Sequence, residues 1–130
     1  MARVIDIYFT QVVGIQVEIR SRLIDSAIIL DISGALNLYV ASLLRDTVDK
    51  KILEGHTRLI INLQDVDYID SSGIGVLIIC TQSLQKCGGA LALVNASEDV
   101  KKVFALTCLE KYFNFLKNET EALSFFKQFP

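Results

Sequence analysis

The run Arg58-Leu59-Ile60-Ile61-Asn62-Leu63 and the segment Asp70-Ser71-Ser72-Gly73 after it decide the fold class of this chain. The first is an almost continuous apolar run, as expected of a central strand covered on both faces. The second leads into Ile74-Gly75-Val76-Leu77-Ile78-Ile79-Cys80, which is apolar nearly all round and predicts a deeply packed helix from about residue 72 to residue 86. A buried strand that leads into a buried helix is typical of α/β domains.

The residues before this unit predict two neighbouring strands and a helix. Residues 15–20 alternate apolar and polar side chains, residues 27–32 are rich in β-branched side chains, and residues 21–26 are expected to form the hairpin turn between them. The next segment has the apolar spacing of an amphipathic helix, for which Asn37 is the expected N-cap. Residues 4–9 predict either an edge strand or an extended N-terminal arm.

The residues after the buried helix continue the alternation of strands and helices. A short buried strand is expected at 90–94, a helix capped by Ser97, a last strand at 112–116 and a terminal helix with a capping box formed by Asn118 and Glu121. The pattern predicts a single α/β domain with a mixed, partly parallel sheet of roughly four to six strands packed against about four helices.

The composition narrows the classes of partner. The chain has 130 residues, of which 52% are hydrophobic, and this fits one folded domain with one core. A net charge of -2 with scattered Lys and Arg gives no electrostatic footprint for nucleic acid. The longest apolar run, Ile74 to Cys80, is far shorter than the roughly 20 residues that span a bilayer, and no signal-peptide pattern is found. We therefore expect a cytoplasmic protein with no nucleic-acid partner and no membrane insertion.

Few residues could support metal binding or catalysis. Cys80, Cys87 and Cys108 are odd in number and form no Cys-x-x-Cys pair, so neither a disulfide framework nor a zinc site is expected. His56 is the only histidine, which leaves no multi-histidine metal site and little support for a Ser-His pair. The glycine turn of dinucleotide-binding folds and the Walker phosphate loop are missing, so we predict no cofactor, no metal and no catalytic residue.

The segment Asp70-Ser71-Ser72-Gly73 allows two interpretations on its own. Both hydroxyls lie at the N-terminus of the buried helix, where unpaired N–H groups and about half a positive charge can stabilise an anion such as a phosphoryl group. The alternative is that Asp70 or Ser71 only caps the helix and that Gly73 permits close backbone packing. These four residues alone favour the helix cap.

Four ordered segments resemble the STAS family, whose type members are bacterial anti-sigma factor antagonists. They are the strand Ile28–Ile32 with Ser33-Gly34-Ala35-Leu36 after it, the strand 59–63, the stretch 66–75, and residues 88–95. The stretch 66–75 is the most specific signature of the family. The resemblance covers roughly residues 13 to 128. We therefore interpret residues 13–130 as a STAS domain and residues 1–12 as an N-terminal arm or edge strand.

The resemblance implies a phosphorylation switch. In the family the serine directly after the signature aspartate is phosphorylated by a partner anti-sigma factor with serine kinase activity, so Ser71 is the expected acceptor and Ser72 a secondary one. The unphosphorylated antagonist binds that partner and frees the sigma factor, the phosphorylated form lets go, and a phosphatase resets Ser71. A phosphoserine beside Asp65, Asp67 and Asp70 would add about -1.5 to -2 charges and oppose the complex. The expected partner-binding residues are Asn37, Tyr39, Asp70, Ser71, Ser72, Gly73 and Ile74.

One position departs from the family pattern. Where the family commonly has Gly-x-x-Asp before the first helix, this chain has Gly34-Ala35-Leu36-Asn37. Asn37 keeps the capping role and loses the charge, so kinase recognition or partner choice is expected to differ here. Tyr39 is either an exposed partner anchor or a residue that fills the edge of the core.

The residues are also compatible with functions other than a phosphorylation switch. A STAS domain without phosphorylation would serve as a subunit of a transport system or as a scaffold of a signalling assembly, and there Ser71 would be only a helix cap. A hydrolase with Ser71 as nucleophile is disfavoured, because the Gly-x-Ser-x-Gly elbow is missing. The sequence does not fix the oligomeric state, and a weak homodimer is one alternative.

Overall fold

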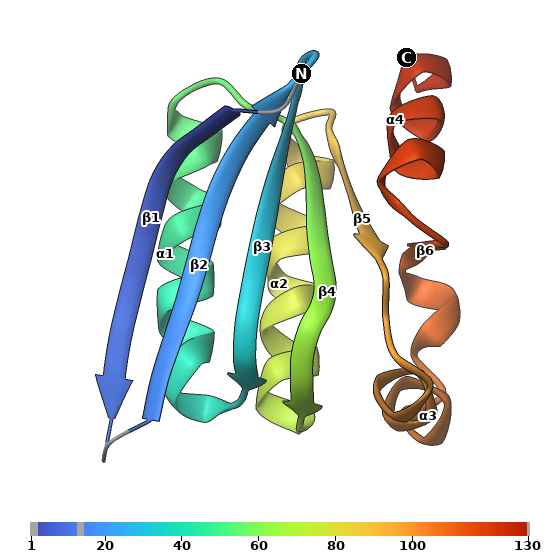
Figure 1. The fold of residues 1–130 in the computed structure, drawn as a ribbon. Coiled ribbons are helices and arrows are strands. Elements are labelled where there is room, and N and C mark those ends of the chain that lie inside the picture. The colour runs from blue at the N-terminus through green and yellow to red at the C-terminus, as the bar shows by residue number, and fades with distance from the viewer. Residues whose placement is uncertain (1–2, 13–14, 130) are drawn as a thin grey trace.

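One mixed sheet organises the computed structural model of this chain, with its strands in the order β1-β2-β3-β4-β5-β6 (Figure 1). The structure describes the backbone of residues 3–12 and 15–129 and the side chains of residues 3–7 and 18–129. The strands are β1 (Arg3–Val12), β2 (Ile15–Ile24), β3 (Ala27–Leu36), β4 (Arg58–Ile69), β5 (Ala90–Val94) and β6 (Asn114–Leu116). The helices are α1 (Leu38–Leu53), α2 (Ser71–Lys86), α3 (Glu98–Thr107) and α4 (Glu119–Gln128), with a 3-10 turn at Glu110–Tyr112.

The direction of the strands changes in the middle of the sheet. β1, β2 and β3 are antiparallel neighbours, whereas β3, β4, β5 and β6 run parallel. Each parallel step is therefore a crossover through a helix. The predicted α/β fold with a mixed sheet of up to six strands and about four helices is confirmed.

Three local predictions need correction. The hairpin turn consists of Asp25 and Ser26 only, because β2 and β3 pair down to Ile24 and Ala27. Asp25 has a φ of 54°, a left-handed conformation that Asp tolerates in tight turns. β4 does not end at residue 63 but stays paired with β3 to Ile69, through two shifts of register. The expected last strand begins with a 3-10 turn, which leaves only Asn114–Leu116 in the sheet.

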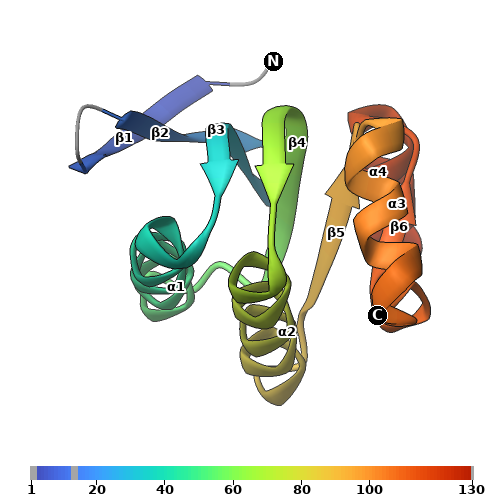
Figure 2. The same ribbon diagram turned by 90° about the horizontal axis from the view of Figure 1, so that it is seen from below.

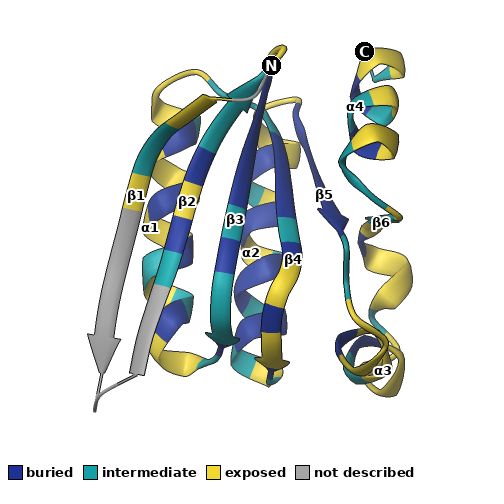
Figure 3. Ribbon diagram, viewed as in Figure 1, coloured by how far each residue is buried: buried dark blue, intermediate teal, exposed yellow. Residues whose placement is uncertain are grey.

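Two apolar clusters occupy the two faces of the sheet (Figures 2 and 3). The larger joins the sheet to α1, α2 and α3 and includes Leu44, Leu77 and Phe104. The smaller lies on the other face and joins Ile29 and Ile60 to Ala122 and Phe126 of α4. The apolar character of α2 predicted from the sequence thus places this helix deep in the larger cluster. Among the described residues, no helix has the length and apolar character that crossing a membrane requires.

Candidate functional site

Two strand-to-helix junctions lie next to each other at one edge of the sheet. Leu36 and Ile69, the last residues of β3 and β4, are register partners, and the Asp70 N–H donates to the Leu36 carbonyl at 3.4 Å. Figure 2 shows the arrowheads of β3 and β4 side by side, each leading into its helix. The N-termini of α1 and α2 are therefore neighbours, although 33 residues of sequence separate Leu38 from Ser71.

The same capping geometry begins both helices. Asn37 and Asp70 have extended backbones, with φ of -123° and -121°. The Asn37 side chain accepts from the N–H groups of Tyr39 and Val40 at 3.0 and 3.3 Å. Asp70 Oδ1 accepts from the N–H groups of Ser72 and Gly73 at 2.9 and 3.1 Å. The predicted N-cap role of Asn37 is confirmed, and the N-cap of α2 is Asp70.

The two serines are left without a capping role. Because Asp70 caps α2, Ser71 is the first residue of the helix and Ser72 the second. Ser71 is exposed and Ser72 is partly buried. Within the described residues neither hydroxyl makes a hydrogen bond, so the Ser71 hydroxyl is open to a modifying enzyme at a helix end that favours negative charge. The alternative in which Ser71 itself caps the helix does not describe this structure.

Gly73 and Ile74, the two residues after the serines, are buried in α2. Gly73 is buried, and a Cβ atom added to it would lie 2.3 Å from the Leu36 carbonyl oxygen. Ile74 is 2% exposed and belongs to the larger apolar cluster. The sequence predicts both residues on the partner-binding surface. The structure gives them a packing role instead: they seat α2 against the end of β3.

Exposed apolar side chains lie at the same end of the sheet as Ser71. Leu38 and Tyr39 begin α1 and are 65% and 63% exposed, so Tyr39 does not fill the edge of the core. Tyr68, at the end of β4, is 52% exposed and was missed by the sequence analysis. We call the exposed side chains Leu38, Tyr39, Asp67, Tyr68 and Ser71 the Ser71 surface. Large exposed apolar side chains next to polar ones are typical of protein-binding surfaces.

The acidic residues expected around Ser71 divide between two places. Asp67 lines a hollow of about 160 Å³ together with Tyr68 and with Asp99 and Val103 of α3. Asp65 lines a different hollow, with Arg20 and other polar residues of β2 and β3. The sequence alone predicts Asp65 beside Ser71 and gives no sign of Asp99 there. Asp67 and Asp99 line the same hollow, and Asp70 follows at the start of α2.

The arrangement does not support nucleophilic catalysis by Ser71. His56 precedes β4 and Ser71 follows it, so the two residues lie at opposite ends of this 12-residue strand. At about 3.3 Å per residue they are separated by roughly 35 to 40 Å. Within the described residues, no group of three or more His, Cys, Asp or Glu side chains could hold a metal ion.

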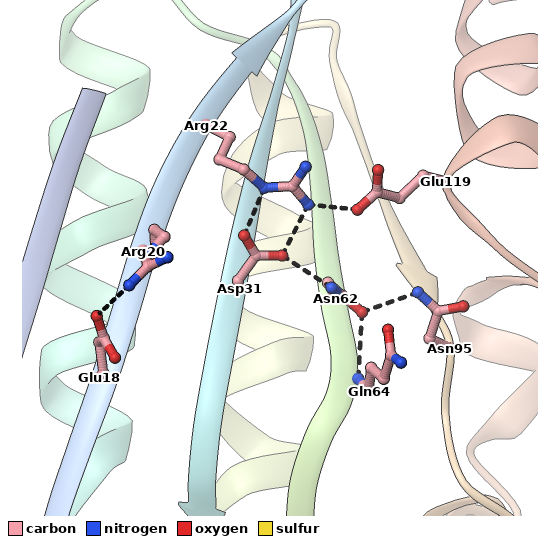
Figure 4. Close-up of polar contacts among 8 residues, drawn as sticks. All are labelled: Glu18, Arg20, Arg22, Asp31, Asn62, Gln64, Asn95 and Glu119. Carbon is pink, nitrogen blue, oxygen red and sulfur yellow. Dashed lines mark hydrogen bonds and ion pairs between the residues drawn. The ribbon is translucent and has the colours of Figure 1, made fainter. Parts of the chain in front are cut away.

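A second polar cluster, on the face of the sheet opposite α1 and α2, has a structural role (Figure 4). The Arg22 guanidinium donates to both Asp31 oxygens, one of them at 2.8 Å, and to Glu119 at the start of α4. These bonds outweigh the cost of burial and raise the pKa of Arg22. Asn62 donates to Asp31 at 2.8 Å and accepts from Asn95 at 2.9 Å. The cluster therefore fastens α4 to β2, β3 and β4.

Comparisons with known proteins agree on one family. The STAS domain model matches residues 15–122. A Thermotoga maritima protein described as an anti-sigma factor antagonist is 31% identical over 103 residues, which are 78% of this chain and 91% of that protein. The anti-sigma-B factor antagonist of Bacillus subtilis is 36% identical over 81 residues, 62% of this chain and 73% of the relative. A crystal structure of a Thermotoga maritima protein with the same description has a TM-score of 0.78 at 29% identity and covers 83% of this chain and 93% of its own.

Proposed function

This chain belongs to the STAS domain family, and we propose that it is an anti-sigma factor antagonist whose binding to its partner is switched by phosphorylation of Ser71. Unphosphorylated, it binds an anti-sigma factor that also has serine kinase activity, and the sigma factor is freed. Phosphorylated, it releases the anti-sigma factor. The relatives named anti-sigma factor antagonists support the class of partner. Such a partner acts on transcription and places this protein in the cytoplasm.

The observation that carries the proposal is that Asp70 caps α2 and leaves the Ser71 hydroxyl exposed. Asp70 holds the first turn of α2 through two N–H groups, so the Ser71 hydroxyl is exposed and makes no hydrogen bond among the described residues. A phosphoryl group can therefore be added without loss of a cap. The N-terminus of α2 then stabilises part of the added negative charge.

The same surface explains why phosphorylation would end the complex. In the unmodified protein, Leu38, Tyr39 and Tyr68 offer exposed apolar area to a partner. A phosphoserine places about -1.5 to -2 charges and a strongly hydrated group among these side chains, near Asp67 and Asp70. Burying that group against an apolar or acidic partner surface carries a large desolvation cost. The fold is unchanged and the interface is lost.

The chain itself is assigned no catalytic activity. The kinase activity belongs to the anti-sigma factor, and a separate phosphatase resets Ser71. Ser72 is partly buried, so it is the poorer acceptor and a secondary site at most. Asn37 caps α1 beside the Ser71 surface without a negative charge. We propose that this neutral cap changes which kinase recognises the chain.

The test is a kinase assay with matched serine variants. The full chain is incubated with ATP and candidate anti-sigma kinases of the same organism, and the mass and position of the modification are read by mass spectrometry. We expect one phosphoryl group on the wild type and on Ser72→Ala, and none on Ser71→Ala. Ser42→Ala, an exposed serine within α1, controls for the substitution itself.

Two results would contradict the proposal. Equal phosphorylation of Ser71→Ala and wild type would show that the phosphate acceptor is another residue. Stable binding of a partner with no phosphorylation at all, and unchanged binding by Ser71→Asp, would favour a STAS domain that acts as a scaffold or as a transport-system subunit.

A further inference from the structure

A groove between α3 and β6 has an aromatic floor and a rim of lysines. One hollow of about 330 Å³ is lined by Lys101, Phe104, Glu110, Lys111, Phe113 and Phe115. A second, of about 250 Å³, shares Lys101 and Phe115 with the first and adds Lys117. In Figures 1 and 2, α3 and β6 lie at the same end of the sheet, beyond β5. We call these two adjoining hollows the α3–β6 groove.

The aromatic floor is a rigid cluster. Phe104 packs edge-to-face on Phe115 and on Phe113, with ring centroids 4.8 and 5.3 Å apart. Phe104 is fully buried and Phe113 is 7% exposed, so the core on one side fixes their positions, whereas Phe115 is only partly buried. The floor of the groove is thus formed before any ligand arrives, which reduces the entropy that binding would cost.

The rim is positively charged in a protein whose net charge is -2. Lys101, Lys111 and Lys117 come from three separate segments, and all are exposed. Lys101 lies 3.8 Å from Glu98 in an exposed pair, which is a weak interaction. Among the described residues, the side chains of Lys111 and Lys117 have no ion-pair partner. Glu110 is the one acidic residue that lines either hollow.

We propose that the α3–β6 groove binds a small aromatic anion, with the ring on the phenylalanine floor and the carboxylate, sulfonate or phosphate at the lysine rim. The volume of the larger hollow lies at the lower end of the roughly 300 to 1,000 Å³ typical of small-molecule sites, and the smaller hollow adjoins it. An apolar pocket with a few convergent polar groups is the usual form of such sites. A neutral apolar ligand would leave the lysines without a partner. An inorganic anion would leave the exposed part of the Phe115 ring uncovered.

This proposal does not depend on phosphorylation of Ser71, so a negative result in the groove would leave the proposed function unchanged. The groove and the Ser71 surface are nevertheless connected by α3, because Lys101 and Phe104 line the groove whereas Asp99 and Val103 of the same helix line the hollow beside Tyr68. A ligand in the groove would contact the helix that borders the Ser71 surface.

The test uses two dyes that differ by one charged group. The probe is 8-anilinonaphthalene-1-sulfonate, and N-phenyl-1-naphthylamine is the same aromatic body without the sulfonate. Fluorescence titration of the full chain gives both affinities, and ¹H–¹⁵N correlation spectra locate the bound dye. We expect the sulfonate to bind at least about five-fold more tightly than the neutral dye, with shifts at the amides of Phe104, Lys111 and Phe115.

Charge-removing variants separate the groove from general dye binding. Lys101→Gln with Lys111→Gln should weaken sulfonate binding by about five-fold, as expected from two exposed charge contacts. The matched variant Lys86→Gln with Lys127→Gln removes the same charge elsewhere and should change nothing. Equal affinity for both dyes, equal effects of the two variant pairs, or shifts centred on Leu38 and Tyr39 would overturn the proposal. So would displacement of the dye by an acidic peptide but by no small aromatic carboxylate, which would assign the groove to a protein partner.

Discussion

Two glycines in α2, two residues apart and on different sides of the helix, test how the Ser71 surface is supported. Gly73→Ala places a Cβ atom 2.3 Å from the Leu36 carbonyl oxygen and 2.9 Å from side-chain atoms of Leu36 and Ile69. The nearest of these is a backbone atom, so it cannot move aside as a flexible side chain does. Gly75→Ala makes the same chemical change in the same helix, and its Cβ atom meets nothing within 4 Å.

The expected effects have opposite signs. Gly75→Ala should stabilise the protein by up to about 1 kcal/mol, which is the difference in helix propensity between the two residues. Gly73→Ala forces α2 away from the end of β3, and overpacking of this kind costs about 1 to 3 kcal/mol. The two variants should therefore differ in free energy of unfolding by roughly 1 to 4 kcal/mol.

Urea unfolding followed by circular dichroism at 222 nm measures this difference. The urea midpoint should fall for Gly73→Ala and rise or stay constant for Gly75→Ala, with similar slopes for both. A Gly73→Ala protein as stable as the wild type would refute the close approach of α2 to Leu36. Equal destabilisation by both variants would show that the loss comes from the helix and not from that contact.

Three further predictions concern the cap, the polar cluster and the thiols. Asp70→Ala removes the acceptor of two N–H groups and should cost about 0.5 to 2 kcal/mol in urea unfolding; an unchanged midpoint would contradict the cap. Arg22→Met leaves Asp31 and Glu119 without their shared guanidinium and should lower the free energy of unfolding by about 1 to 3 kcal/mol. Arg20→Met breaks an exposed pair and should lower it by less than about 0.5 kcal/mol. Equal losses of stability would show that the Arg22 cluster does not fasten α4. Burial, and then the Asp49 carboxylate, raise the pKa of the Cys80 thiol to about 12. Cys80 should therefore stay protonated and resist a disulfide reagent at pH 8, while the exposed thiols of Cys87 and Cys108 react. Fast reaction of all three thiols would contradict the burial of Cys80.

Local patterns in the sequence were sufficient to predict which residues cap the N-termini of α1 and α4. Asn37 and Asn118 act as caps through N–H groups two or three residues further along, so the relevant contacts lie within one turn. The capping box at the last helix is only partly formed, because Glu121 accepts from the Lys117 N–H instead of returning to the Asn118 N–H. Even there, the predicted cap residue is correct.

Contacts between distant segments were beyond the sequence analysis. Tyr68 is exposed at the end of β4, beyond two shifts of register against β3. Asp99 reaches the same end of the sheet through a helix that begins 27 residues after Ser71. Ile74 is among the partner-binding residues expected from the sequence. Which side of α2 faces the core depends on how the helix packs against β3, and that packing buries Ile74.

We propose that phosphorylation of Ser71 releases the anti-sigma factor. The most direct measurement is isothermal titration calorimetry of the unmodified protein and of protein phosphorylated only at Ser71, each against the same anti-sigma factor. Like-charge repulsion and desolvation of the phosphate should weaken binding by about 30-fold or more, equivalent to roughly 2 kcal/mol. Equal affinity of the two forms would contradict the account.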